Sequence, residues 1–452
     1  MRMMFSPSKR LAALSPRTRR LLSTTVASYL ARGVSAAVLL LTIPLARRLL
    51  DPDLFGLWMM LGALLSFLAF ADLGIGNGLM NRVSQAVHRG NHDEAARTTV
   101  AAYFSTLACG LALCTGWFAW LLLANEPLRF AGAIPAAHVA QAAAAFSTLV
   151  VLVALSLPVQ VTQKLQLVAQ DGHWVGLSQL AAATGTLVLL PLGLWLELPL
   201  AALLLCTFGL QVGVGAATGV YWLVVRQQVP GLRAAPLQGQ VVSGLLRTGS
   251  LFFVLQLCAA FAFQSDAFVI SQLLGPAAYG DFAAVQRLFL SITMLVSASM
   301  VGLWPAFSDA LARNDLPWAR RAFARSLALG VAVMSLLCAA ITLAMPWIGQ
   351  HWLAMTTAIP LALLLTLSGW TVLETLGQIS GTLLNGAGII RAQVGVAVVV
   401  AVASFAAKWW LVAEVGAWGA VLASIVAYSV VSVPCQVWLL RRVLRPTSLA
   451  PG

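Results

Sequence analysis

With 452 residues, of which 60% are hydrophobic and only 9% charged, this chain is not a water-soluble globular domain, whose charged fraction is normally about a quarter. Its net charge of +13 would suggest a nucleic-acid partner in a soluble protein. The positions of the basic residues therefore have to decide between nucleic-acid binding and membrane topology.

Apolar stretches of about 20 residues, each long enough to cross a ~30 Å hydrocarbon core as a helix, recur along the whole sequence. They predict an all-α polytopic membrane protein with 12 transmembrane helices. The expected spans are residues 24–46, 54–80, 98–124, 139–162, 174–196, 200–225, 243–272, 278–302, 324–348, 358–384, 390–412 and 416–439. Gly and Pro interrupt several of them, which membrane helices tolerate.

Lys and Arg are unevenly divided between the two ends of these spans. With the N-terminus placed inside, 21 fall on the cytoplasmic side and 4, including Lys408, at or near the outer face, while Arg32 and Arg287 fall within spans. This asymmetry is the positive-inside pattern, so it favours an inner (plasma) membrane protein with both termini cytoplasmic and no nucleic-acid partner. The basic leader, residues 1–22, is expected to lie on anionic membrane lipids.

The phrase LLDPDLFG at residues 49–56 returns as LLGPAAYG at residues 273–280, a shift of 224 residues. Without gaps, 12 of the 49 positions from Leu49 to Arg97 are identical at this shift, where chance gives about four. The shift carries the second span onto the eighth, so the two halves enter the membrane in the same direction. This predicts two six-helix lobes related by an internal parallel repeat, the build in which transporters bind substrate between lobes.

The predicted domains follow from the repeat and the spans. They are a basic cytoplasmic leader (1–22), an N-terminal six-helix lobe (23–226), a cytoplasmic linker (227–247), a C-terminal six-helix lobe (248–440) and a cytoplasmic tail (441–452).

Ionisable side chains within spans cost about 3 kcal/mol each to insert and are therefore candidate functional residues. Asp266 lies nine residues before the outer turn at Gly275 and Arg287 lies twelve after it, so their depths differ by only ~5 Å and an ion pair is predicted. Two interpretations stay open. The pair holds two helices together, or Asp266 couples to a cation or proton while Arg287 meets a phosphate, for which a guanidinium fork is suited.

Other polar residues in or near the spans divide into four sets. Arg32 is too deep to reach the interface easily and is a candidate contact for an anionic substrate, whereas Asp72 and Glu374 fit either an inner gate or proton relay, or ordinary contacts near helix ends. Lys164, Lys408 and Glu414 are expected at membrane interfaces. Uncharged candidates for sugar binding, for which bridging between helices is the alternative use, are Asn77, Gln256, Gln264 and Asn385.

Several familiar sites are missing from the sequence. It has no GxxxxGK[ST] loop, so ATP hydrolysis by the chain itself is not expected. His88 and His92 have helical spacing but no Glu or Cys completes a zinc set, so neither a metal nor another cofactor is predicted. Asp51-Pro52-Asp53 has the Asp-x-Asp form of metal-dependent glycosyltransferases, but an outer turn that caps a helix explains it better.

The stretch LARRLLDPDLFGLW (45–58), then FADLGIGNGL (70–79) and RVSQAVHRGNHDEAAR (82–97), resembles a known family. The family that it resembles is the polysaccharide-transport branch of the multidrug, oligosaccharidyl-lipid and polysaccharide (MOP) exporter superfamily. This branch contains O-antigen and other lipid-linked oligosaccharide flippases. In the second half, DAFVISQLLGPAAYGDFAAVQRL (266–288) resembles the family's helix 7 to 8 segment, whose acidic position matches Asp266.

The resemblance implies a non-enzymatic flippase that works by alternating access. Its substrate would be a polyprenyl-pyrophosphate-linked oligosaccharide, such as an O-antigen or exopolysaccharide repeat unit, carried from the cytoplasmic to the periplasmic leaflet. The superfamily commonly couples transport to H⁺ or Na⁺, and cavity arginines commonly meet the pyrophosphate, which here would be Arg32 and Arg287. Other glycan-assembly proteins would be its partners.

Two alternative functions remain open. MATE-like or facilitator-type efflux of small molecules fits the same architecture, although the loop NRVSQAVHRGNHDEA lacks the Gly-x-x-x-Asp-Arg-like signature of facilitators. A membrane glycan polymerase or ligase is disfavoured because the longest outer loop, NEPLRFAGAIPAAH, is only about 15 residues long and contains no paired acid and base.

Overall fold

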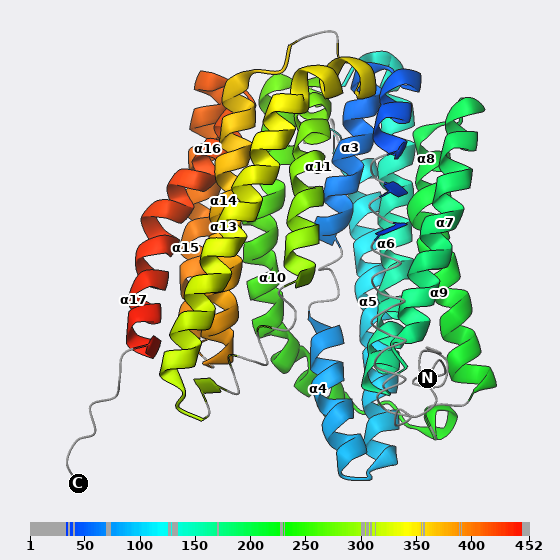
Figure 1. The fold of residues 1–452 in the computed structure, drawn as a ribbon. Coiled ribbons are helices and arrows are strands. Elements are labelled where there is room, and N and C mark those ends of the chain that lie inside the picture. The colour runs from blue at the N-terminus through cyan, green and yellow to red at the C-terminus, as the bar shows by residue number, and fades with distance from the viewer. Residues whose placement is uncertain are drawn as a thin grey trace, which may run out of the picture. The chain divides into compact units, whose positions relative to one another are not determined.

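Every regular element in the described part of the chain is a helix (Figure 1). The computed structural model describes residues 41–68, 74–124, 134–169, 171–226, 231–299, 313–353, 358–387 and 391–444, with 33, 34, 37, 38, 128, 229, 303, 307, 310, 311, 355 and 389. The helices of the first half are α3 (Pro52–Leu68), α4 (Ile75–His88), α5 (His92–Leu123), α6 (Val139–Val168), α7 (His173–Trp195), α8 (Leu200–Leu204) and α9 (Leu210–Val220). Those of the second half are α10 (Gly239–Leu274), α11 (Pro276–Ser299), α13 (Leu316–Trp347), α14 (Leu361–Gly386), α15 (Arg391–Val415), α16 (Trp418–Ala427) and α17 (Val433–Leu444).

Short π-helical turns extend several of these helices. Leu205–Gly209 joins α8 to α9, Tyr221–Val225 follows α9, Ile348–Trp352 follows α13, and Tyr428–Ser432 joins α16 to α17. Two single 3₁₀ turns, Ala136–His138 and Leu232–Ala234, lie in connections.

The chain divides into two compact units that do not follow the sequence halves. Unit 1 contains Met1–Leu45, Phe67–Pro127 and Val139–Val254, and unit 2 contains Ala46–Ser66, Leu128–His138 and Leu255–Gly452. All of α3 except its last two residues therefore belongs to unit 2, although the sequence-based boundaries placed this helix in the N-terminal lobe. Helix α10 begins in unit 1 and ends in unit 2.

In the described residues, eight helices are long and apolar enough to cross a membrane. The expected span 54–80 contains two helices, α3 up to Leu68 and α4 from Ile75, and α4 begins after Gly74 with φ 73°. This left-handed conformation strains residues with a Cβ atom, so glycine favours a helix start here. The predicted count of twelve spans stays a prediction.

The 224-residue spacing recurs in local structure. Helices α3 and α11 begin at Pro52 and Pro276, and α5 and α13 begin at His92 and Leu316, so both pairs of starts differ by 224. The N-caps match as well: Asn91 Oδ1 accepts from the Glu94 backbone N–H at 3.0 Å, and Asp315 Oδ1 accepts from the Trp318 backbone N–H at 3.1 Å. Side-chain caps of this kind satisfy N–H groups that a helix start leaves unpaired.

The two copies of the repeated phrase pack against each other within unit 2. A Cβ atom on Gly280 would lie 2.9 Å from the Gly56 Cα atom and 2.9 Å from the Phe55 ring, and one on Gly56 would overlap the Pro276 carbonyl. Equivalent glycines of the two repeats therefore face each other. This close approach of α3 to α11 explains why both copies of the phrase keep the glycine.

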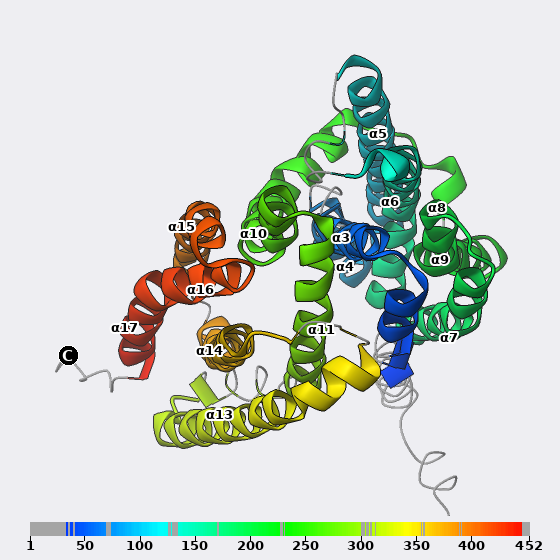
Figure 2. The ribbon, with the colours of Figure 1, turned by 90° about the horizontal axis from the view of Figure 1, so that it is seen from above.

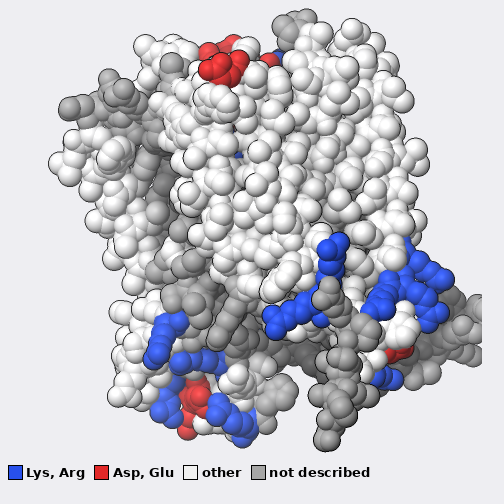
Figure 3. Space-filling view, turned by 90° about the vertical axis from the view of Figure 1, so that its left-hand side faces the viewer, with Lys and Arg blue, Asp and Glu red and all other residues white. Residues whose placement is uncertain are grey.

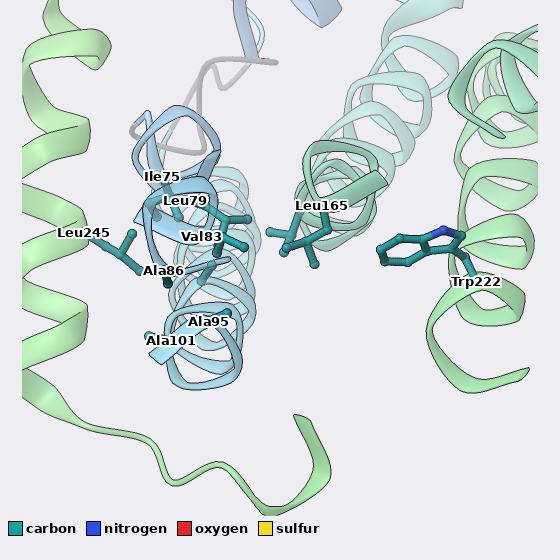
Figure 4. Packing of buried hydrophobic residues seen from close by; sticks show 11 residues of the cluster. Ile75, Leu79, Val83, Ala86, Ala95, Ala101, Leu165, Trp222 and Leu245 are labelled. Atoms are coloured by element: carbon teal, nitrogen blue, oxygen red, sulfur yellow. The ribbon is translucent and has the colours of Figure 1, made fainter. Parts of the chain in front are cut away.

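Unit 1 is held together by an apolar cluster on α4, α5, α6, α10 and the π-helical turn after α9. Figure 4 shows Val83 and Leu165 pointing toward each other and the Trp222 ring pointing toward Leu165. Trp222 is buried, and its indole N–H donates to the Asp171 carboxylate at 3.1 Å. The hydrogen bond satisfies two polar groups that burial would otherwise destabilise.

In unit 2, α14 lies between α13 and α16 when seen from above (Figure 2). One face of α13 exposes Leu329, Leu336 and Leu343, which are seven residues apart, at 67%, 70% and 82%. A stripe of exposed leucines along one helix face fits contact with lipid, which replaces water as the surrounding solvent. In the space-filling view, Lys and Arg gather toward one end of the face and a broad, almost uncharged surface lies beyond them (Figure 3).

Candidate site around a buried ion pair

The deepest charged side chain of the described residues is Lys408 on α15, which is completely buried. Its Nζ atom lies 2.6 Å from Asp266 Oδ1 on α10 and donates a hydrogen bond of 2.9 Å to Ser265 Oγ. Asp266 is also buried, at 6% exposure. Because an isolated buried charge costs several kcal/mol, this lysine and aspartate stabilise each other's ionised form.

A second residue supports the carboxylate from α11. Gln286 Nε2 donates to Asp266 Oδ2 at 3.4 Å. Oδ1 accepts no well-directed hydrogen bond, so its contact with Lys408 is mainly ionic. The carboxylate thus faces a cation on one side and a neutral amide on the other.

Helix geometry places the two charges at the same depth. Asp266 lies eight residues before the end of α10 at Leu274, and Lys408 lies seven before the end of α15 at Val415. At 1.5 Å per residue both are ~11 Å from the helix end. The aromatic rings of Phe268 and Trp409, next to the pair in sequence, meet edge to face at 5.8 Å and help to fix α10 against α15.

Arg287 follows Gln286 on α11 but does not take part in this ion pair. A Cβ atom on Gly62 of α3 would lie 3.4 Å from Arg287 Nη2, so the guanidinium packs against α3. Among the described residues the half-buried Arg287 forms no ion pair.

The structure corrects two predictions. The expected Asp266–Arg287 ion pair is wrong, because Asp266 pairs with Lys408. The interfacial position expected for Lys408 is also wrong, because this side chain is 0% exposed. The physical reason is the same in both cases. Helix α15, which is distant in sequence, places the Lys408 ammonium against Asp266, where the Arg287 guanidinium of α11 was expected.

A second set of charges, which the sequence analysis did not identify, lies near the turn between α10 and α11. Arg47 forms an ion pair with Asp281 on α11 and lies 5.2 Å from the Phe55 ring centroid. Arg48 Nη2 donates to the His351 carbonyl at 2.7 Å. The internal repeat does not predict this ion pair, because neither Arg47 nor Asp281 has an identical residue at the equivalent position 224 residues away.

Two further predicted residues have local partners. Glu374 on α14 accepts from Gln378 Nε2 at 3.4 Å, one turn along the same helix. Asn385 Oδ1 accepts from Gln393 Nε2 on α15 at 3.0 Å. Asn385 therefore bridges two helices, the alternative use considered for such amides.

The side chains of the remaining predicted site residues fall outside the described part of the chain. Arg32 and Asp72 lie outside the described residues, as do the side chains of Asn77, Gln256 and Gln264. Within the described part of the chain, no three His, Cys, Asp or Glu side chains form a group that could hold a metal ion.

The arrangement of these side chains favours binding of ions. Neutralisation of the Asp266 charge would remove the countercharge that faces Lys408, and unit 2 would then contain two cations, Lys408 and Arg287, without that carboxylate. An anionic ligand would then be the natural partner for both.

Comparisons with known proteins show the family and the fold of the chain. A family described as "Polysaccharide biosynthesis protein" matches residues 21–311, which is more than half of the chain. No curated protein sequence matches significantly.

Three solved structures share the fold over nearly the whole chain. An inward-facing multidrug resistance MATE family transporter of the MOP superfamily is 17% identical with a TM-score of 0.76, covering 96% of this chain and 100% of that one. An outward-facing form of such a transporter is 16% identical with a TM-score of 0.63, covering 98% and 99%. A MOP superfamily transporter from Pyrococcus furiosus Vc1 (DSM3638), whose reversed pocket polarity suggests a different function, is 15% identical with a TM-score of 0.65, covering 98% and 99%.

Proposed function

Because the chain belongs to the polysaccharide biosynthesis protein family of MOP-type membrane transporters, we propose that it is a flippase for a polyprenyl-pyrophosphate-linked oligosaccharide. It would carry this lipid from the cytoplasmic to the periplasmic leaflet by alternating access, using twelve helices in two six-helix lobes with both termini in the cytoplasm. An O-antigen or exopolysaccharide repeat unit is the expected cargo.

The observation that carries the proposal is the position of Arg287. Its guanidinium packs against Gly62 in a helical region where charges are costly, and no carboxylate among the described residues neutralises it. An uncompensated guanidinium inside a membrane protein favours binding of an anion, and its fork geometry matches phosphate oxygens. A pyrophosphate headgroup has this chemistry.

The Lys408–Asp266 pair supports a coupling step. Lys408 Nζ and Asp266 Oδ1 lie 2.6 Å apart, so the two charges neutralise each other. Uptake of H⁺ or Na⁺ by the Asp266 carboxylate would release the Lys408 ammonium, which could then join Arg287 in holding the pyrophosphate. Return of the ion to the solvent would restore the pair and favour release of the anion.

Substitution of Arg287 in cells whose surface glycan depends on this chain tests the proposal. Arg287→Ala is expected to abolish glycan export at unchanged membrane abundance, while Arg287→Lys keeps the charge, loses the fork and retains partial export. Arg325→Ala, which removes the same charge from the exposed start of α13, is the matched control and should export normally. Full export by Arg287→Ala would contradict the assigned site.

Efflux of small molecules is the second transport function, because two of the similar structures are multidrug transporters. Uptake of fluorescent cationic drugs into inverted vesicles separates the two. An unpaired arginine repels cationic drugs, so the flippase proposal predicts no drug uptake above that of vesicles without the protein. Strong uptake that is independent of glycan synthesis would favour efflux instead.

A further inference from the structure

Unit 2 has an apolar groove that the proposed transport function does not use. A cavity of about 660 Å³ lies between α13, α14 and α17, and its walls include Phe323, Leu376, Val437 and Leu440. Seen from above, these three helices lie next to one another at one side of unit 2 (Figure 2). All its lining residues belong to this unit.

One end of the groove is positively charged. Arg320 and Arg441 line it there, next to Leu444 at the end of α17. Arg320 Nε donates to the Leu444 carbonyl at 2.9 Å, and Nη2 donates to the same oxygen, which ties α13 to α17. Arg441 is exposed, and within the described residues the groove contains no acidic side chain.

The other end is closed by a polar contact between helices. Gln436 Nε2 donates to the Tyr428 hydroxyl at 2.8 Å, and a Cβ atom on Gly377 of α14 would overlap this hydroxyl. The Trp370 ring meets the Tyr428 ring edge to face at 5.8 Å. Glycine at position 377 therefore lets the tyrosine lie against α14 and sets the depth of the groove.

The length of the groove corresponds to one leaflet of a bilayer. From Arg441 to Tyr428 are 13 residues, or ~20 Å of helix, against ~15 Å for half of a hydrocarbon core. Val437 and Trp438 are 40% and 58% exposed, so this side of α17 faces the surroundings. An apolar channel one leaflet long with two guanidinium groups at its end matches a lipid tail below an anionic headgroup.

We propose that this groove binds an anionic phospholipid of the cytoplasmic leaflet, with an acyl chain along α14 and α17 and the phosphate on Arg320 and Arg441. The assignment of the leaflet uses the positive-inside topology proposed above, whereas the binding site itself does not depend on which cargo the protein carries. The lipid would join α13 to α17 at the same end as the Arg320–Leu444 hydrogen bonds.

Native mass spectrometry of the full chain in detergent, with phosphatidylglycerol or phosphatidylcholine added, tests the site. The expected result is tighter retention of phosphatidylglycerol, weakened about fivefold by each of Arg320→Gln and Arg441→Gln, since each arginine contributes one phosphate contact. Arg442→Gln is the matched control, because Arg442 lies over the Trp438 ring at 5.8 Å and does not line the groove.

A filling variant tests the apolar part without disturbing the core. Val437→Trp, at a partly exposed position in the groove, should reduce retention of either lipid, and Val430→Trp, at a 68% exposed position outside it, should not. Equal retention of the two lipids, or unchanged retention in both arginine variants, would overturn the proposal. The proposal would also be overturned if the protein formed a dimer without bound lipid and only Val437→Trp abolished that dimer. A second copy of the chain would then occupy the groove.

Discussion

Neutralising Lys408 gives the sharpest separation of structural from functional roles for the buried pair. Lys408→Gln removes the cation 2.6 Å from Asp266 Oδ1 and leaves a buried carboxylate with only Gln286 as partner. Breaking a buried ion pair in this way costs about 3–5 kcal/mol, or ~10²–10⁴-fold in the folded to unfolded ratio. Asp266→Asn should cost a similar amount from the other side.

The double variant Lys408→Gln/Asp266→Asn removes both charges, and neutral replacement of a buried pair is often tolerated. We expect its thermal unfolding midpoint, measured by fluorescence-detected size-exclusion chromatography in detergent, to return close to that of the wild type. Glycan export should stay lost, because no ionisable carboxylate remains to exchange an ion. Glu414→Gln, at an exposed position on the same helix, is the control and should change neither readout.

Two results would refute this reasoning. If Lys408→Gln unfolds at the wild-type temperature, the pair is not buried as described. If the double variant exports glycan at the wild-type rate, the charges only hold α10 and α15 together and Asp266 couples nothing.

Three further predictions concern packing, capping and topology. Gly280→Ala forces α11 away from α3 and should destabilise the protein by about 1–3 kcal/mol in the same unfolding assay. Gly213→Ala is the control, because a Cβ atom there meets nothing within 4 Å, and it should not destabilise the protein. Equal unfolding midpoints of the two variants would contradict the close packing. Asn91→Ala and Asp315→Ala should each cost about 1 kcal/mol, and clearly unequal losses would show that the two repeats do not use their caps alike. A single cysteine at Glu197, in the turn after α7, should react with a membrane-impermeant maleimide in intact spheroplasts, and labelling only after lysis would reverse the proposed topology.

The repeat is the part of the structure that sequence reasoning predicts best. Identities at the 224-residue shift extend from Leu49 to Arg97, and the helix starts and N-caps recur at that shift because these features depend on residues close together in sequence. Local signals of this kind need no knowledge of which helices are neighbours. The break between α3 and α4 was missed because the apolar run through residues 54–80 masks the helix start after Gly74.

The partner of Asp266 shows where such reasoning ends. Depth along a helix can be counted from the sequence, and it matched Asp266 with Arg287 to within ~5 Å. The same count places Lys408 within ~1.5 Å of Asp266, but α15 lies more than 100 residues away in sequence and nothing local shows that it packs on α10. The depth of a charged residue along its helix therefore gives possible ion-pair partners, and the tertiary packing of the helices decides which of them forms the pair.

Transport by the purified protein tests the central claim most directly. Proteoliposomes would be loaded with a labelled polyprenyl-pyrophosphate oligosaccharide, and the fraction accessible to an external lectin followed with time. We predict that wild-type protein and Arg325→Ala move the lipid between leaflets faster than protein-free liposomes do, and that Arg287→Ala does not. Wild-type protein with no activity above protein-free liposomes, or Arg287→Ala with undiminished activity, would contradict the account.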